Sequence, residues 1–539
     1  MSLLAVFISS LVSCLFLTPI VRSLAVRFGL VDRPDGQRKL QARAVPLGGG
    51  LAILLSAMAA VVIAATWSPL RSDLLGQLPM LIGLGCAALW IAAVGLVDDS
   101  RGLRGRTKLI GQFVAVVIVM ASGVVIRSVS FFGADVNLGL LSYPFTAFLL
   151  LGAINSLNLL DGMDGLLSCI GLIVCIALAV VATQLAHWPA ACIATALAGA
   201  LLGFLRYNSP PASIFMGDCG SMVVGLVIGV MAIQGSLKGT ATVALTAPLT
   251  ILTLPIFDTL AAIVRRRLTG RSIYAPDRGH LHHCLLRSGL TVPRVLVCVA
   301  VLSLVTLIGA LASVVWHAEW VALVSALAVV LMLVATRSFG HAEFELLKKR
   351  LVHKFSGAQA NGGPRYLEVR IQGKADWSSL GHDLAAQAEE LGLISLCLDI
   401  NAPALHEAYL GRWERGGDQP EDHSIWRTQI PLSAAGHSLG RLDIVGRGSG
   451  QSTSSKIAIL AGLVEDLEFG LGNIIRRARV HTSPVAANGR SPLSIFAVNG
   501  EHVAASVGTQ TALYEEANGE TYLDSELGNG DLSSSRKPR

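Results

Sequence analysis

Long apolar stretches separated by short polar loops make up most of the first 336 residues. A stretch of about 18 or more apolar residues can cross the hydrocarbon core of a bilayer as a helix. The pattern predicts about eleven such spans, of which those near 142 and 219 are the shortest. They lie near residues 2–21, 45–66, 79–97, 109–126, 142–157, 166–186, 188–205, 219–234, 241–264, 292–315 and 319–336.

The pattern changes after the last apolar stretch. Residues 341–355 have helical spacing of apolar and basic positions, which is typical of a helix on an anionic leaflet or of a solvated connecting helix. Strand-like and helix-like segments then alternate as far as a predicted closing helix at 456–477, and residues from about 480 onward lack periodicity. We therefore predict an all-α polytopic membrane protein, residues 1–340, with a small cytoplasmic α/β domain, residues 341–480, and a disordered tail, residues 481–539.

Composition and charge support this prediction and orient the spans. The chain has 539 residues, of which 53% are hydrophobic and 14% charged, and its mean hydropathy is +0.61. Alternate loops contain 17 and 3 Lys and Arg residues, and basic loops remain in the cytoplasm. The first span is predicted to be retained, and the nine cysteines have no metal-ligand spacing. The net charge of +6 adds little, and no nucleic-acid partner is expected.

Two adjacent carboxylates, Asp98 and Asp99, end an apolar stretch on the predicted cytoplasmic side. Two such charges about 4 Å apart repel by roughly 4 kcal/mol at an effective dielectric constant near 20. A divalent cation or a shared proton would relieve this repulsion, whereas a solvated pair at a helix end is the simpler interpretation. Further polar clusters on the same side favour a functional site.

One such cluster repeats a polar residue every three positions at the end of a predicted span. Asparagine amides can bind a metal through oxygen or a nucleotide base through both ends, and Gly162 and Gly165 allow a sharp turn. A carboxylate beside hydrocarbon is costly, on the order of 3 kcal/mol at the centre of a span. The cluster comprises Asn155, Asn158, Asp161 and Asp164.

Asp218 and Asp258 are two further candidates near span ends. Asp218 lies between glycines in FMGDCGS, where a loop can present its carboxylate and backbone amides can approach an anion. The alternative for Asp218 is a simple helix cap. Asp258 is interpreted either as a structural residue or as one that orients a basic partner.

Histidines and basic residues complete the polar set. The segment DRGHLHHCLL contains three histidines close to several arginines, including Arg278. Zinc is one interpretation, but no fourth ligand has suitable spacing and the arginines would repel a cation. We favour phosphate binding by arginine and imidazole groups. Other basic residues at predicted span ends are Arg38, Lys39 and Lys108.

Together these motifs resemble the polyprenyl-phosphate N-acetylhexosamine-1-phosphate transferase family, in particular its bacterial undecaprenyl-phosphate N-acetylglucosamine-1-phosphate transferase branch. The resemblance covers about residues 1–336 and excludes the C-terminal region. Gln41 replaces a histidine that often follows the Arg-Lys pair, so a titrating role there is in doubt. The matching segments are RKxxxxxxPLGGG, VGLVDDSRGL, NSLNLLDGMDGL, FMGDCGS, PIFD and GHLHH.

The resemblance assigns roles residue by residue. It implies that Asp98 and Asp99 are catalytic and that Asp218, Asn158 and Asp99 bind a metal, expected to be Mg²⁺ with Mn²⁺ as a substitute. The other candidates divide into two groups. The nucleotide-sugar site would contain Asn155, Asp161, Asp164, His280, His282 and His283, and the phosphate-binding residues would be Lys108, Arg38, Lys39 and Arg278.

The activity implied by the resemblance is transfer of N-acetylglucosamine 1-phosphate from UDP-N-acetylglucosamine to undecaprenyl phosphate, with release of UMP. This enzyme would initiate a cell-envelope glycan in the bacterial inner membrane among membrane lipids, with the active site and C-terminus cytoplasmic; a homodimer is compatible with it. The open alternatives are another UDP-N-acetylhexosamine or UDP-MurNAc-pentapeptide as donor. A transporter is disfavoured because the polar residues lie at span ends and no repeat is visible.

Overall fold

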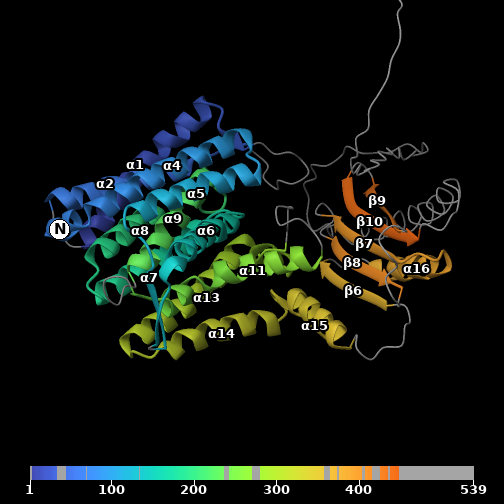
Figure 1. Ribbon diagram of the computed structural model, residues 1–539. Helices are drawn as coiled ribbons and strands as arrows, with labels where there is room; N and C mark the ends of the chain where they lie inside the picture. The colour runs from blue at the N-terminus through green and yellow to red at the C-terminus, as the bar shows by residue number, and fades with distance from the viewer. Residues whose placement is uncertain are drawn as a thin grey trace, which may run out of the picture. The chain divides into compact units, whose positions relative to one another are not determined.

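A computed structural model describes residues 3–32, 44–67, 69–132, 134–235, 242–269, 279–356, 365–372, 376–402, 407–415, 425–434 and 437–447. Up to residue 356 the described chain is mostly helical (Figure 1). Its helices are α1 Leu3–Arg27, α2 Gly49–Trp67, α3 Arg71–Gly76, α4 Leu78–Arg101, α5 Gly105–Ala121, η1 Gly139–Leu141, α6 Ser142–Leu160, α7 Leu166–Gln184, α8 Trp188–Asn208, α9 Gly217–Gln234, α10 Thr246–Ile251, α11 Thr253–Leu268, α12 Leu281–Arg287, α13 Val292–Val315, α14 Glu319–Ala335 and α15 His341–Ser356.

Within these described ranges, eight helices are long and apolar enough to cross a membrane. The protein is therefore a multi-pass membrane protein. Each predicted span overlaps helical structure, although α14 and α5 have only 17 residues each, so the count of eleven remains a prediction. At the start of the predicted span at 241–264, residues 242–244 form a strand instead. The predicted span at 241–264 is divided at Leu252 into α10 and α11. Pro255 explains the division, because a proline ring clashes with the carbonyl four residues earlier, here that of Ile251.

Helix α9 lies at the centre of the bundle, since 83% of the residues in its apolar stretch are buried. It packs against α2, α4 and α6. Glycines allow close contact at these crossings: a Cβ on Gly225 would lie 2.6 Å from the Ile154 Cα, and Gly50 lies directly against Gly220. Close packing at small residues is a common way for helices to associate in membranes.

Short strands join the loops of the bundle. Strand β1, Val31–Asp32, pairs with β2, Val45–Pro46, just before α2. A three-stranded sheet with the order β4-β3-β5 is formed by residues between the helices. Its strands are β3 Ser128–Phe131, β4 Ala134–Asn137 and β5 Thr242–Ala244.

The C-terminal region contains a five-stranded sheet with the order β6-β8-β7-β10-β9. Helix α16, Trp377–Glu390, packs on it through Trp377, whose indole N–H donates to Glu407 at 2.9 Å. Helix and strand are both present, as predicted, but every strand pair is antiparallel. The predicted helix at 456–477 and the tail from 481 lie outside the described residues. The strands are β6 Arg365–Gln372, β7 Ser395–Ala402, β8 Glu407–Glu414, β9 Ile425–Ala434 and β10 His437–Arg447.

Candidate active site

Four helix ends meet at one end of the bundle. Helices α4 and α6 end there, and α5 and α9 begin there, because the chain reverses direction in the short loops that join successive helices. Gly217 begins α9 with φ of +72°, and a Cβ at this position would lie only 2.5 Å from Asp99 Oδ2. Glycine therefore permits both the backbone turn and the close approach of α4.

The ammonium of Lys108, in the first turn of α5, lies among oxygen atoms from three other helices. Its Nζ is 3.0 Å from Asp98 Oδ2 and 2.8 Å from Asp218 Oδ1. It also donates to Asn158 Oδ1 at 3.3 Å. The structure thus brings together Asp98, Asn158 and Asp218 around one cation, although up to 120 positions separate them in the sequence.

Asn158 connects α6 directly to α9. Its side-chain amide donates to Asp218 Oδ1 at 2.5 Å and to Ser221 Oγ at 2.7 Å. Since the same Asp218 oxygen also faces Lys108, the hydrogen bonds fix the direction in which this carboxylate points. The arrangement leaves Asn158 with its carbonyl oxygen directed to the ammonium.

Asp99 has a different set of partners from Asp98. Its two carboxylate oxygens accept the backbone N–H groups of Asp218, at 2.8 Å, and Cys219, at 3.2 Å. These amides belong to the first turn of α9, where helix N–H groups have no partner within the helix. Asp99 therefore caps α9 and holds Asp218 in place, and a negative charge is favourable at this helix end.

Gln112 of α5 is a polar residue of the site region that sequence reasoning missed. It is fully buried and exchanges hydrogen bonds with Asn155: its Nε2 donates to Asn155 Oδ1 at 3.3 Å, and Asn155 Nδ2 donates back at 2.8 Å. A single amide within an apolar span was the available signal, because intramembrane polar groups usually have a partner. The nucleotide-sugar role of Asn155 stays a prediction.

The loop after α6 carries Asp161 and Asp164 in distinct environments. Burial, and then the negative charges of Asp218, Asp99 and Asp164, raise the pKa of the Asp161 carboxyl to about 8. Asp164 Oδ2 accepts the N–H of Ala212 at 2.9 Å and so ties this loop to the one before α9. Asp161 is thus a neutral group beside the carboxylate cluster at pH 7, and Asp164 holds the loop.

The histidine segment packs against the same loop. Asp258 of α11 accepts from Leu281 N–H at 2.8 Å and pairs with His280 Nδ1 at 3.0 Å. Asp258 therefore contacts a histidine, as one of its two interpretations predicts, and accepts a backbone amide at the start of α12, as a structural residue does. The His282 ring lies next to Gly162, where a Cβ would be 2.7 Å from its Nε2. His282 therefore borders the loop that carries Asp161.

His282 is 2% exposed, and neither ring nitrogen has a hydrogen-bond partner within the described part of the chain. Burial, and then the charges of His283 and His280, lower the pKa of His282 well below its usual value of 6.5. The ring is consequently neutral at pH 7. It can offer one N–H donor and one acceptor to a bound molecule but no positive charge.

Three predicted phosphate-binding residues, Arg38, Lys39 and Arg278, lie outside the described residues. The Gly-rich segment that follows Arg38 and Lys39 is described, however, and lies beside the loop that precedes Asp218. Gly49 N–H donates to Phe215 O at 3.0 Å, and Phe215 N–H donates to Pro46 O at 2.9 Å. The early Gly-rich motif and the FMGDCGS motif therefore adjoin each other.

Among the described residues, no three His, Cys, Asp or Glu side chains form a metal-binding group. The oxygen set around Lys108 nevertheless has the chemistry that a hard divalent cation requires, since it combines carboxylates with an amide oxygen. It already surrounds one positive charge. The residues present therefore fit Mg²⁺ by donor type.

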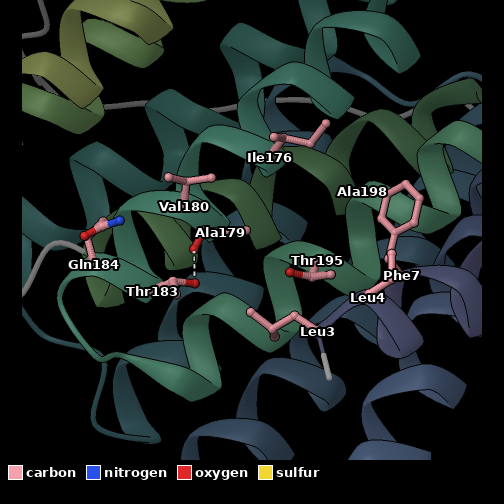
Figure 2. A pocket seen from close by; sticks show the side chains of 10 residues that line it. All are labelled: Leu3, Leu4, Phe7, Ile176, Ala179, Val180, Thr183, Gln184, Thr195 and Ala198. Carbon is pink, nitrogen blue, oxygen red and sulfur yellow. Dashed lines mark hydrogen bonds between the residues drawn. The ribbon is translucent and has the colours of Figure 1, made fainter. Parts of the chain in front are cut away.

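A separate apolar groove of about 460 Å³ lies between α1, α7 and α8 (Figure 2). Its lining includes Leu3 and Thr183, near the ends of α1 and α7, and Thr195, in the half of α8 away from Asn208. Gly165 and Asn208 are hydrogen-bonded at the site end of the bundle. The groove thus belongs to the opposite end and contains no charged side chain.

Comparisons with known proteins agree on one family. Residues 81–236 match the model of glycosyl transferase family 4. The chain is 34% identical over 287 residues to a probable undecaprenyl-phosphate N-acetylglucosaminyl 1-phosphate transferase of Bacillus subtilis, covering 53% of the chain and 77% of that relative.

Two further relatives extend the range of named activities. A decaprenyl-phosphate N-acetylglucosaminephosphotransferase of Mycolicibacterium smegmatis is 33% identical over 344 residues, 60% of the chain and 84% of the relative. A phospho-N-acetylmuramoyl-pentapeptide-transferase of a Thermoanaerobacter species is 32% identical over 298 residues, 52% of the chain and 88% of the relative.

Proposed function

The chain belongs to glycosyl transferase family 4, and from this premise we propose that it transfers N-acetylglucosamine 1-phosphate from UDP-N-acetylglucosamine to undecaprenyl phosphate. The observation that carries the proposal is the set of oxygen atoms of Asp98, Asn158 and Asp218 around Lys108. Such a set at the end of a membrane bundle suits two phosphorylated substrates, one of which is a lipid.

The reaction joins two phosphates. An oxygen of the lipid phosphate attacks the β-phosphorus of the nucleotide sugar, a phosphorus–oxygen bond forms, and the bond from this phosphorus to UMP breaks. Because the second pKa of a phosphate monoester is near 6, the nucleophile is largely ionised at neutral pH. A strong base is not needed, and the principal task of the protein is to position the phosphates and balance their charge.

Each member of the cluster has a role in this reaction. Asp98 positions the lipid phosphate, and Lys108 supplies positive charge between the carboxylates and that phosphate. Asp99, whose oxygens are both engaged by backbone amides, positions α9 rather than removing a proton. The family resemblance implies that Asp99 is a metal ligand. Because Asp99 contacts the α9 amides and Asp98 lies in the oxygen set around Lys108, we assign this place to Asp98 instead.

The metal in the proposal is Mg²⁺, with Mn²⁺ as a substitute. Asp218, Asn158 and Asp98 would hold it through oxygen, the donor type that these ions prefer. When bound, the ion would neutralise charge on the diphosphate.

The nucleotide sugar is assigned to the Asp161–Gly165 loop and the histidine segment. His282 contributes a neutral N–H donor there, alongside His280, His283, Asn155 and Asp164. Arg38, Lys39 and Arg278 remain candidate phosphate ligands. The excess of Lys and Arg in the loops at this end of the bundle supports a site on the cytoplasmic side of a bacterial inner membrane.

A second donor is favoured by one observation, the 32% identity to a phospho-N-acetylmuramoyl-pentapeptide-transferase. The same chemistry would apply, with UDP-MurNAc-pentapeptide in place of UDP-N-acetylglucosamine. Competition between these donors and UDP-N-acetylgalactosamine distinguishes them, because the true donor suppresses transfer of the others at the lowest concentration.

The test supplies membranes containing the protein with labelled UDP-N-acetylglucosamine, undecaprenyl phosphate and Mg²⁺. We expect labelled lipid and UMP in equal amounts, with loss of both on addition of EDTA. Asp218→Asn should lower the rate by about 100-fold or more, as loss of a group that organises charge at a reacting centre does. The matched control is Asp73→Asn, an exposed aspartate of α3. Metal-independent turnover, or a wild-type rate for Asp218→Asn, would contradict the proposed site.

A further inference from the structure

Helix α11 holds the histidine segment at two points that are two helical turns apart. The Asp258 carboxylate pairs with the His280 ring and accepts the Leu281 N–H, as described above. Seven residues later, the Arg265 guanidinium lies directly against the backbone of Gly279, the residue before His280. Residues seven apart share one face of a helix, so a single face of α11 supports the start of the segment.

Arg265 is itself buried, with 3% of its surface exposed. A buried guanidinium requires a counter-charge, because its transfer from water is otherwise very unfavourable. The counter-charge comes from α15: Glu343, 7% exposed, forms an ion pair with Arg265 Nη1. The two helices are in contact at this point.

Glu343 follows α14 and precedes the C-terminal strands, so it lies outside the region that carries the family motifs. We propose that Glu343 is a positioning residue for the nucleotide-sugar site. It acts through Arg265, whose guanidinium it holds against Gly279, and thereby fixes the orientation of His280 and His282. This inference rests on the proposed function and adds α15 to the elements that shape the site.

The test is a graded series in the full-length protein. Glu343→Gln removes the charge, and Glu343→Asp keeps the charge but shortens its reach. We expect KM for UDP-N-acetylglucosamine to rise about tenfold in Glu343→Gln and about threefold in Glu343→Asp, since small displacements of positioning groups have effects of this size or larger. KM for undecaprenyl phosphate should be unchanged, because the residues proposed to contact the lipid phosphate, Asp98 and Lys108, lie on α4 and α5.

The matched control is Glu345→Gln on the same helix. Glu345 is only partly buried and pairs with His341 one turn earlier, at 3.8 Å. The Glu345→Gln variant should retain the wild-type KM for both substrates. If Glu343→Gln fails to insert in the membrane, the Glu343→Asp variant decides the matter by the same measurement.

A second readout does not depend on activity. The Cys284 thiol lies one turn after His280 and donates to Gly279 O at 3.5 Å, so its reaction rate with a maleimide reports how firmly the segment is held. Peptide mass spectrometry should find faster labelling of Cys284 in Glu343→Gln than in Glu345→Gln.

Unchanged labelling together with an unchanged KM would overturn the proposal. So would an equal loss of affinity for both substrates, which would indicate a general loss of structure. If the wild-type protein does not use UDP-N-acetylglucosamine, the proposed function fails, and Cys284 labelling still tests the link between α15 and the histidine segment.

Discussion

Asp98 and Asp99 are adjacent in sequence, yet α4 directs their carboxylates to different partners. Successive residues on a helix are separated by about 100° around its axis. Asp98 therefore faces Lys108, and its other oxygen accepts the Leu103 N–H at 2.6 Å, whereas Asp99 faces the start of α9. Asp98 thus belongs to the cluster around Lys108, whereas Asp99 holds the start of α9.

Asp161 leads to a prediction about pH. In the absence of a divalent cation its native pKa is about 8, compared with about 4 in an unfolded chain. Between these values the unfolded chain has lost the proton that the native protein retains. The native state should therefore lose stability as the pH rises from 5 to 8, and this loss should stop above pH 8.

The measurement is thermal unfolding of the detergent-solubilised protein in EDTA at several pH values. Asp161→Asn should remove this pH dependence. Between pH 5 and 8 the free energy of unfolding of the variant should therefore rise relative to that of wild type by about 1 kcal/mol per pH unit or less. Parallel curves for the two proteins between pH 5 and 8 would contradict the assigned environment of Asp161.

At the scale of elements, the crossing of α6 and α9 determines whether Asn158 reaches Asp218. Ile154, one turn before Asn158, meets Gly225, which lies one turn after Ser221. This close contact fixes the position of α6 relative to α9 one helical turn away from the Asn158–Asp218 hydrogen bond. The glycine at this crossing thus serves the site without belonging to it.

We therefore expect Gly225→Ala to impair activity. Its methyl group would lie 2.6 Å from the Ile154 Cα, and relief of such overlap costs about 1–3 kcal/mol in a packed interior. Specific activity per inserted molecule should fall roughly tenfold, since Asn158 would move away from Asp218. It is measured with the labelled-lipid assay.

Gly152→Ala is the matched control. Gly152 lies on α6, the helix that α9 crosses at Gly225, and a Cβ at Gly152 would meet nothing within 4 Å. Its activity should equal that of wild type. Wild-type activity in Gly225→Ala would show that α6 and α9 adjust without disturbing the cluster.

At the scale of the whole molecule, every site residue placed by the structure precedes residue 344, whereas the chain continues to residue 539. We predict that a chain ending after residue 356 inserts in the membrane and retains activity within about threefold of full length, because the chemistry resides in the site rather than in the attached domain.

A chain ending after residue 340 lacks Glu343 as well. It should show the raised KM for UDP-N-acetylglucosamine expected of Glu343→Gln, and comparison of the two truncations by steady-state kinetics separates α15 from the sheet that follows it. Complete loss of activity in a stably inserted chain ending at 356 would mean that the C-terminal domain takes part in catalysis.

The sequence by itself determined that the protein is a multi-pass membrane protein and which polar residues are candidates for its site. A span must be apolar over its length because hydrocarbon offers no partners to polar groups, so the long helices are visible as runs of hydrophobic residues. The same constraint makes polar clusters at span ends conspicuous, so Asp98, Asn158, Asp218 and His282 are recognisable as candidates from the sequence.

Only the tertiary structure decided which of these groups meet. Each of these contacts joins residues on different helices: Asp99 with the start of α9, Gln112 with Asn155, and Glu343 with Arg265. Helix crossings set such pairings through side-chain packing between distant segments, and a hydrophobic pattern along one segment contains no record of its neighbours. The pattern therefore predicts which helices form, while packing between them fixes the chemistry of the site.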